Sequence, residues 1–247
     1  SGIFIGNDIG TSGLVSRNVV SRSTATGFSG IGILADGDGQ PTVSNNTIDG
    51  YWVPLAMRDG YPSRLPTYTD NTITNSRHDG MIGLYGQLTS GTWGSTVSVY
   101  APYVIGATQS YGGPDRDVVL PARQSFTFPA GAIVKFVDWY SNNRDSAKFR
   151  IEHGAELTVA GTSESPVVFT SGMDDDYGGD TNGDGSASAP RRGDWRGIEG
   201  ICDGTDCSTI TLEHAIIRYG GDWYGASVLG RGDTIIKHTT LEHNTGN

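Results

Sequence analysis

The sequence predicts an all-β chain built as a parallel β-helix, in which short strands stack on copies of themselves. Polar, Asn-containing corners followed by a β-branched pair recur, and Thr47 and Thr72 in two such corners stand 25 positions apart. Apolar residues alternate with polar ones over short segments, and no stretch keeps the spacing of an amphipathic helix for three turns. A unit this short cannot bury its own apolar face, so it must stack on its neighbours.

The N-terminal third of the chain carries the clearest repeat. Its corners lie at residues 16–20, 45–48 and 70–73, and glycine-punctuated apolar alternations follow at 30–34 and 80–84. Asn tolerates the left-handed backbone of a bend, and stacked Asn side chains can hydrogen-bond along the stacking axis. Asn46 and Asn71 are therefore predicted to be structural, the alternative being a catalytic or sugar-binding role.

The rhythm lapses between about residues 87 and 128, where we expect a loop excursion from an otherwise single β-helix domain spanning residues 1–247. Aligning EHAIIRYGG with KHTTLEHNTG pairs Ile217 with Leu241, 24 positions apart. Further short strands are expected at 128–136, 148–151, 155–159, 166–170, 195–198, 208–212, 215–219, 234–237 and 239–241.

An acidic segment interrupts the strands at about residues 172–194. It contains Asp174, Asp175, Asp176, Asp180 and Asp184, and with Asn182 and Gly185 its second half reads D-x-N-x-D-G. Alternate oxygen-bearing side chains followed by glycine are typical of a calcium loop.

The match to a helix-loop-helix calcium site is partial. The twelfth position counted from Asp180 is Arg191 where a bidentate Glu is expected, and the flanks are rich in Gly, Ser and Pro. We therefore expect Ca²⁺ in a loop on a β scaffold, with residues 174–176 or Asp194 supplying the missing charge. The alternative is a solvated acidic loop.

Cys202 and Cys207 are the two cysteines of the chain, within the turn-forming sequence ICDGTDC. A local disulfide suits this spacing and an oxidising location, while two free thiols remain the alternative. Two cysteines alone cannot make a zinc site.

The charge balance excludes some partners. The formal net charge is −10 and only Lys135, Lys148 and Lys237 are lysines, which argues against a nucleic acid partner. No apolar run is long enough to span a membrane. The chain opens on SGIFIGND without a signal segment, so we expect any export signal to have been removed or to lie outside this sequence.

The succession PAGAIVKF, AELTVAGT, PVVFTS, DDDYGGDTNGDG, GDWRGI and LEHAIIRYGG resembles secreted bacterial and archaeal proteins with right-handed parallel β-helix repeats. The resemblance implies right-handed winding, an extracellular or cell-surface location, and calcium in the acidic loop. It does not imply one activity, because such folds serve as surface proteins, adhesins and polysaccharide-degrading enzymes.

Three functions are compatible with these patterns. The first is a non-catalytic structural or adhesive β-solenoid stiffened by calcium, as a unit of a filament, sheath or tandem-repeat surface protein. The second is a polysaccharide lyase or hydrolase, with Asp174, Asp180 and Asp184 holding the metal and Arg191, Arg192, Arg196 or Arg218 facing the sugar. The third is a carbohydrate-binding module. Carboxylates that are consecutive on one loop, instead of recurring at the repeat interval, weaken the enzyme hypothesis.

His214 and His238 occupy equivalent places in EHAII and KHTTL, so their rings are predicted to stack. Metal binding or acid-base work by these residues and His243 is the alternative, although the spacing offers no third ligand.

The two ends of the chain predict self-association. Residues 241–247 joined to residues 1–6 continue the repeat, parallel to NSRHDG-MIGLYG. Unpaired strand edges accept further strands, so head-to-tail addition of copies is expected, the alternative being a fragment of a longer solenoid.

Overall fold

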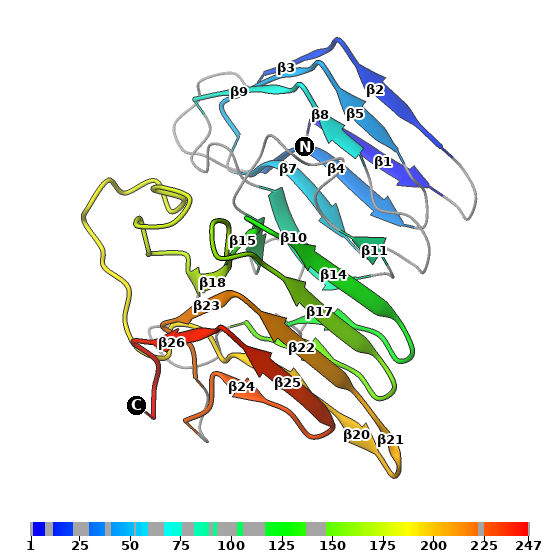
Figure 1. Ribbon diagram of the computed structural model, residues 1–247. Coiled ribbons are helices and arrows are strands. Elements are labelled where there is room, and N and C mark those ends of the chain that lie inside the picture. The colour runs from blue at the N-terminus through cyan, green and yellow to red at the C-terminus, as the bar shows by residue number, and fades with distance from the viewer. Residues whose placement is uncertain are drawn as a thin grey trace.

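The computed structural model of the chain describes residues 2–7, 12–21, 30–37, 41–51, 53–58, 67–75, 82–88, 91–92, 103–105, 117–136, 147–221 and 225–246. Within these ranges the protein consists of strands and turns and contains no helix. The strands form stacked parallel sheets, as Figure 1 shows.

Among the described residues, the largest sheet has 13 strands, which come from the N-terminal, middle and C-terminal parts of the chain. It begins with β1 (Ile3–Asn7), β4 (Ile31–Gly37), β7 (Val53–Arg58) and β10 (Ile82–Gln87). From β10 one branch continues through β12 (Tyr103–Ile105), β15 (Ile133–Phe136), β18 (Val167–Ser171), β23 (Ala215–Arg218) and β26 (Thr240–Glu242). The other continues through β13 (Val118–Leu120), β16 (Phe149–Ile151), β19 (Ile198–Gly200) and β24 (Val228–Leu229).

Three smaller parallel sheets complete the stack. Two belong to its N-terminal part: β2 (Leu14–Ser16), β5 (Thr42–Ser44) and β8 (Thr67–Thr69), and β3 (Val19–Ser21), β6 (Thr47–Asp49) and β9 (Thr72–Thr74). The third contains β11 (Gly91–Thr92), β14 (Ser125–Pro129), β17 (Glu156–Ala160), β22 (Thr209–Glu213) and β25 (Asp233–Lys237). The described residues include one antiparallel pair, β20 (Cys202–Asp203) with β21 (Asp206–Cys207).

The strand register follows the sequence repeats. Thr47 is the partner of Thr72, and Ile217 is the partner of Leu241, as the aligned repeats predict. Register of this kind is fixed because alternate side chains point to opposite faces of a sheet, and a shift by one residue would expose the apolar set.

The core lies between the stacked sheets and is aromatic in the C-terminal half. Phe128 packs edge-to-face on Phe149 and Phe169, with ring centroids 5.7 and 5.2 Å apart. Trp195 is fully buried and stacks on Phe136 at 4.0 Å. Stacked copies of the same alternating pattern thus bury rings that one unit alone would leave in water.

An asparagine ladder (Asn18, Asn46 and Asn71) joins three consecutive corners in the N-terminal part. The Asn46 side chain donates to Asn71 Oδ1 at 2.8 Å and to the Val15 carbonyl at 2.9 Å, and its Oδ1 accepts from Asn18. Asn45, the residue before it, has a φ of 56°, as the corner prediction requires. The structural role predicted for Asn46 and Asn71 is confirmed by these bonds.

The segment at about residues 87–128, where a loop excursion is expected, contains short strands in its described part. Strands β11, β12, β13 and β14 all begin within it and pair in register with their neighbours. Three of these strands, β11, β12 and β13, have only two or three residues, which is too little alternation for a sequence pattern to be recognised. Residues 89–90, 93–102 and 106–116 of that segment lie outside the described part.

Among the described residues, no helix has the length and apolar character needed to cross a membrane.

Candidate functional site

The acidic loop, residues 172–194, connects β18 to β19 and extends from one side of the stack (Figure 1). It covers a row of polar side chains on the outer face of the largest sheet. Lys135 on β15 pairs with Thr170 on β18, and Arg218 on β23 follows the partner of Phe169. The neighbours of these three residues along each strand point to the core, so the three polar side chains point outward. They are nevertheless buried. The loop therefore shields this row from water.

Lys135 provides the central cation of the loop. Its ammonium donates to the carbonyl oxygens of Asp174 (2.8 Å) and Gly179 (2.6 Å) and to Thr181 Oγ1 (3.1 Å). Thr181 in turn donates to the Gly172 carbonyl at 3.0 Å. One fully buried amine thus holds both ends of the turn between residues 172 and 181.

Burial lowers the pKa of Lys135 from its ordinary 10.5 to about 8, against the carboxylates of Asp174, Asp175 and Asp180, which act to raise it. At neutral pH the amine remains an ammonium, so it donates three hydrogen bonds to three oxygen acceptors. This arrangement of hard oxygens around a positive charge resembles what a metal ion would require.

Arg218 neutralises the first carboxylates of the loop. Its guanidinium lies 3.5 Å from Asp174, 3.2 Å from Asp176 and 3.1 Å from Glu242 on the next strand. Asp174 is 1% exposed and also accepts a short hydrogen bond from Thr170 Oγ1. Burial acts to lower the pKa of Arg218, but Asp174 and the neighbouring groups outweigh it and raise the pKa above its ordinary value.

Two tyrosines enclose the same guanidinium. The Tyr177 and Tyr219 ring centroids lie 5.1 and 5.0 Å from Arg218 Cζ, within cation–π range. The side chain of Arg218 is 8% exposed as a result of these contacts. Arg218 is therefore a structural cation of the loop and does not face solvent as the enzyme hypothesis requires.

The end of the loop is fixed through Asp194 and Trp195. Asp194 Oδ2 accepts from Ser171 Oγ at 2.7 Å and from the Arg191 backbone at 2.8 Å, and burial raises the pKa of this carboxyl. Trp195 Nε1 donates to the Arg218 carbonyl at 2.7 Å. Asp194 thus joins the loop exit to the end of β18.

The D-x-N-x-D-G run forms a tight turn around Asp180. Asp180 Oδ1 accepts from the backbone of Gly183 (2.7 Å) and Asp184 (3.2 Å), and its Oδ2 accepts from Gly185 at 2.7 Å. Gly183 and Gly185 have φ values of 67° and 72°, which favour glycine. Asn182 Nδ2 donates to Asp184 Oδ2 at 3.1 Å. The run therefore forms a turn that closes on the Asp180 carboxylate.

The carboxylates of residues 175–184 have features that bear on whether this part of the loop binds a cation. Asp184 Oδ1 is buried and accepts no hydrogen bond from the described residues, and the pKa of Asp175 is raised by burial and then by the nearby Asp180 carboxylate. Both favour a positive charge at this point. Across the described residues, however, no three or more His, Cys, Asp or Glu side chains converge to hold a metal. A cation here needs Asn182 and backbone oxygens as further ligands.

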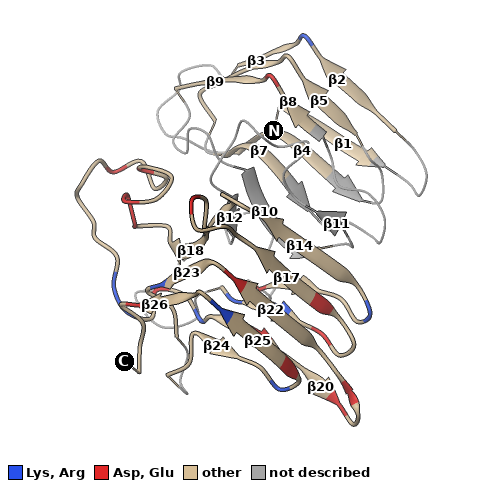
Figure 2. Ribbon diagram, viewed as in Figure 1, with Lys and Arg blue, Asp and Glu red and all other residues tan. Residues whose placement is uncertain are grey.

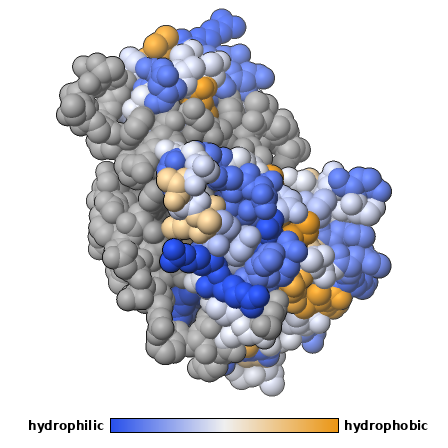
Figure 3. All heavy atoms as spheres, turned by 90° about the vertical axis from the view of Figure 1, so that its left-hand side faces the viewer, coloured by the Kyte–Doolittle hydropathy of each residue, from blue (hydrophilic) through white to orange (hydrophobic). Residues whose placement is uncertain are grey.

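The expected ligands thus separate into two groups. Asp180, Asn182 and Asp184 are joined by the hydrogen bonds of the tight turn, and the charge of Asp180 acts on Asp175. Asp174 and Asp176 lie against Arg218, and Asp194 is bonded to Ser171. Figure 2 shows the acidic residues along the loop and the basic residues at its exit. On this side of the molecule the described surface is mostly hydrophilic, with small separate hydrophobic patches (Figure 3).

Lys135 is the main residue of this site that the sequence patterns did not assign to the loop. The available signal was a lysine between Val134 and Phe136 in a strand whose neighbours are apolar. Such a position predicts that the lysine side chain points outward. It does not predict the loop that covers the side chain, because Lys135 and Asp174 are separated by 39 positions.

The remaining arginines that could face a sugar differ in their surroundings. Arg192 Nη1 donates to the Asn244 carbonyl at 3.3 Å, and Arg196 Nε is buried without a hydrogen bond to the described residues. Arg191 is exposed.

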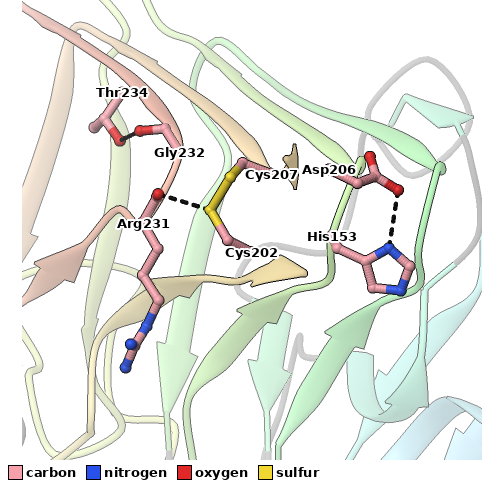
Figure 4. The surroundings of a disulfide bond; sticks show 7 residues. All are labelled: His153, Cys202, Asp206, Cys207, Arg231, Gly232 and Thr234. Carbon is pink, nitrogen blue, oxygen red and sulfur yellow. Dashed lines mark hydrogen bonds and ion pairs between the residues drawn. A yellow bond between two sulfur atoms is a disulfide. The ribbon is translucent and has the colours of Figure 1, made fainter. Parts of the chain in front are cut away.

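Cys202 and Cys207 form a disulfide across the antiparallel pair β20–β21 (Figure 4). At the tip of this hairpin Asp206 Oδ2 lies 3.1 Å from His153 Nδ1 and 2.7 Å from Arg123 Nη2. The hydrogen bond to His153 and the charge of Arg123 lower the pKa of Asp206. The hairpin therefore contacts the turns of two earlier strand connections.

The same hairpin also contacts the connection that follows it. Cys202 Sγ lies 2.7 Å from the Arg231 carbonyl oxygen (Figure 4). A disulfide sulfur carries no hydrogen, so this is a close sulfur–oxygen contact and not a donated bond. The hairpin therefore contacts strand connections that precede it and one that follows it along the stacking direction.

The histidine stack predicted from the repeat is confirmed. His214 and His238 are parallel, with ring centroids 4.7 Å apart, and Tyr219 and His243 stack in the same way at 5.4 Å. All four residues have φ values between 48° and 59° and occupy corners. Their rings therefore serve the packing of successive corners.

Comparison of the chain with protein-family models, with curated proteins and with solved structures finds no significant match in any of the three.

Proposed function

We propose that the chain is a right-handed parallel β-helix of the secreted repeat class and acts outside the cell as a non-catalytic structural or adhesive module. The observation that carries this proposal is the use of its charged residues. Arg218, the arginine best placed beside the acidic loop, is 8% exposed and paired with three carboxylates. Parallel stacking with a closed core is consistent with a stiff, elongated element.

Calcium binding to the second half of the acidic loop is part of this proposal. Asp180, Asn182 and Asp184 would hold the ion, and the buried Asp184 Oδ1 and the raised pKa of Asp175 support its position. The ion would supply charge neutralisation and rigidity, whereas the first half of the loop already has Lys135 and Arg218. Calcium would therefore order residues 180–188 and leave residues 172–179 little changed.

Thermal unfolding with calcium or with EDTA tests this site. At calcium concentrations 100 times the dissociation constant we expect stabilisation of about 2.7 kcal/mol, because the ion binds the folded chain alone. Asp184→Asn should abolish the shift, and Asp233→Asn, which changes an exposed carboxylate on β25, should retain it. Equal melting temperatures with calcium and EDTA in the unaltered protein would show that the loop binds no calcium.

Self-association through the outermost strands is the second part of the proposal. Six large apolar side chains are exposed there: Phe4, Leu14, Val19, Ile235, Ile236 and Leu241. A parallel strand from a second copy would cover them in the way that inner strands cover one another. Sedimentation should show concentration-dependent growth that Leu241→Lys weakens. A monodisperse monomer at high concentration would contradict this part of the proposal.

A polysaccharide lyase remains the second candidate because the same architecture supports that chemistry. The structural proposal predicts that pectate and alginate release no unsaturated products absorbing in the ultraviolet. Release that Arg196→Ala abolishes, with folding preserved, would instead establish the lyase. A glycan array would separate a purely structural module from an adhesive or carbohydrate-binding one.

A further inference from the structure

The acidic loop contains the sole Asn-Gly pair of the chain, Asn182–Gly183. This pair is chemically labile because glycine has no side chain to hinder attack by its backbone nitrogen on the preceding Asn side chain. A bond forms between Gly183 N and Asn182 Cγ, and ammonia leaves with the amide nitrogen. Water then opens the resulting succinimide and yields aspartate or isoaspartate, so that one water is consumed for each ammonia released.

In the folded loop each group that must react is engaged. Gly183 N donates to Asp180 Oδ1 at 2.7 Å, so the attacking nitrogen is bound to another acceptor. Asn182 Nδ2 donates to Asp184 Oδ2 at 3.1 Å and to Ser188 Oγ at 2.7 Å, which fixes the leaving amide. Asn182 is 8% exposed, although Gly183 beside it is exposed. Reaction therefore requires these bonds to open.

We propose that Asn182 is a spontaneous deamidation site that the hydrogen bonds of the acidic loop keep closed, and that opening of the loop converts it to a carboxylate. The change is one-way. A carboxylate at position 182 replaces the amide that donates to Asp184 with an oxygen that repels it, so the loop does not reclose as before. The isoaspartate product also lengthens the backbone within the turn.

The predicted effect of calcium on deamidation rests on the calcium site of the proposed function. The protection of Asn182 by hydrogen bonds does not depend on that site. A cation between Asp180 and Asp184 would hold the loop shut and slow deamidation. After conversion the run reads D-x-D-x-D-G, which adds a charged ligand for the same cation. The modified loop would then depend on calcium more strongly than the original.

Peptide mapping by mass spectrometry measures the reaction at position 182. The protein is incubated at one mildly alkaline pH in calcium, in EDTA, and unfolded in guanidinium. We expect the folded chain in calcium to react roughly tenfold or more slowly than the unfolded chain, since only open molecules react. Asp180→Ala removes the acceptor of Gly183 N and should accelerate deamidation. Asp176→Ala changes a carboxylate of the same loop that contacts Arg218, and should not.

Each outcome decides one point. Equal rates in the folded and unfolded chain, or equal acceleration by Asp180→Ala and Asp176→Ala, would overturn the proposal. Acceleration by EDTA supports both closure and the proposed calcium site. Acceleration by Asp180→Ala without an effect of EDTA supports closure by hydrogen bonds and contradicts the calcium site. Asn182→Asp, which represents one product, should increase proteolysis of residues 178–190 in EDTA, and unchanged proteolysis would refute the one-way opening.

Discussion

Two regions of this protein bury polar groups in different ways. In the N-terminal part, the asparagine ladder satisfies the corners with neutral side chains that repeat at separations of 28 and 25 residues. In the C-terminal part, Lys135 and Arg218 satisfy a single acidic loop with buried charge. A neutral ladder distributes its hydrogen bonds over several strands, whereas the loop depends on two residues.

The largest effect should come from the charged region. Arg218→Met keeps much of the side-chain volume but leaves Asp174, which is 1% exposed, without its cation. Removing one partner of a buried pair is expected to lower the free energy of unfolding by about 3–5 kcal/mol. Chemical denaturation measures this loss, and Lys237→Met on exposed β25 is the control. A loss no greater than that of the control would show that the pair is dispensable.

A substitution at one position of the asparagine ladder should lower the free energy of unfolding by less than Arg218→Met does. Asn46→Leu removes the donors to Val15 and Asn71 and the acceptor of Asn18, and we expect a loss of about 2–3 kcal/mol. Thr72→Ala, at an exposed position on β9, is the matched control in the same denaturation experiment. If Asn46→Leu proves more damaging than Arg218→Met, the contrast between the two regions is incorrect.

The smallest effect concerns the pH dependence of Lys135. Its pKa is about 8 in the folded chain and 10.5 ordinarily, so between these values the unfolded chain binds more protons. The free energy of unfolding contributed by Lys135 therefore rises with pH, by about 1 kcal/mol from roughly pH 8 to pH 9.

A matched variant isolates this contribution. Lys135→Met should lack the rise, so its stability relative to the unaltered protein should fall as pH increases through that interval. Lys148→Met, which removes another lysine of the same fold, corrects for general effects of alkaline pH. A stability difference for Lys135→Met that is independent of pH would show that the buried amine does not titrate there.

The same contrast separates the features that the sequence predicts from those it does not. The pairing of Ile217 with Leu241 and the roles of Asn46 and Asn71 were predictable, because a repeat shows the same local pattern several times. The partnership of Lys135 with the loop occurs once and joins distant residues, so no periodicity reports it. The acidic pattern predicts a bound cation, which stays a prediction, whereas the contacts of Lys135 and Arg218 with the loop were not predicted.

The acidic loop is a long connection between strands whose pairing does not require a fixed connection length. Lys148 and Glu199 are ion-paired across 51 residues that include the loop, while Gly220 and Asn244 are bonded across 24. Strand register is thus independent of the length of the connection. The exposed segment at residues 185–187 is accordingly a site where a foreign peptide could be inserted and displayed while β16 and β19 keep their pairing. Changes in length at residues 185–187 should therefore leave the strand register beneath the loop unaltered.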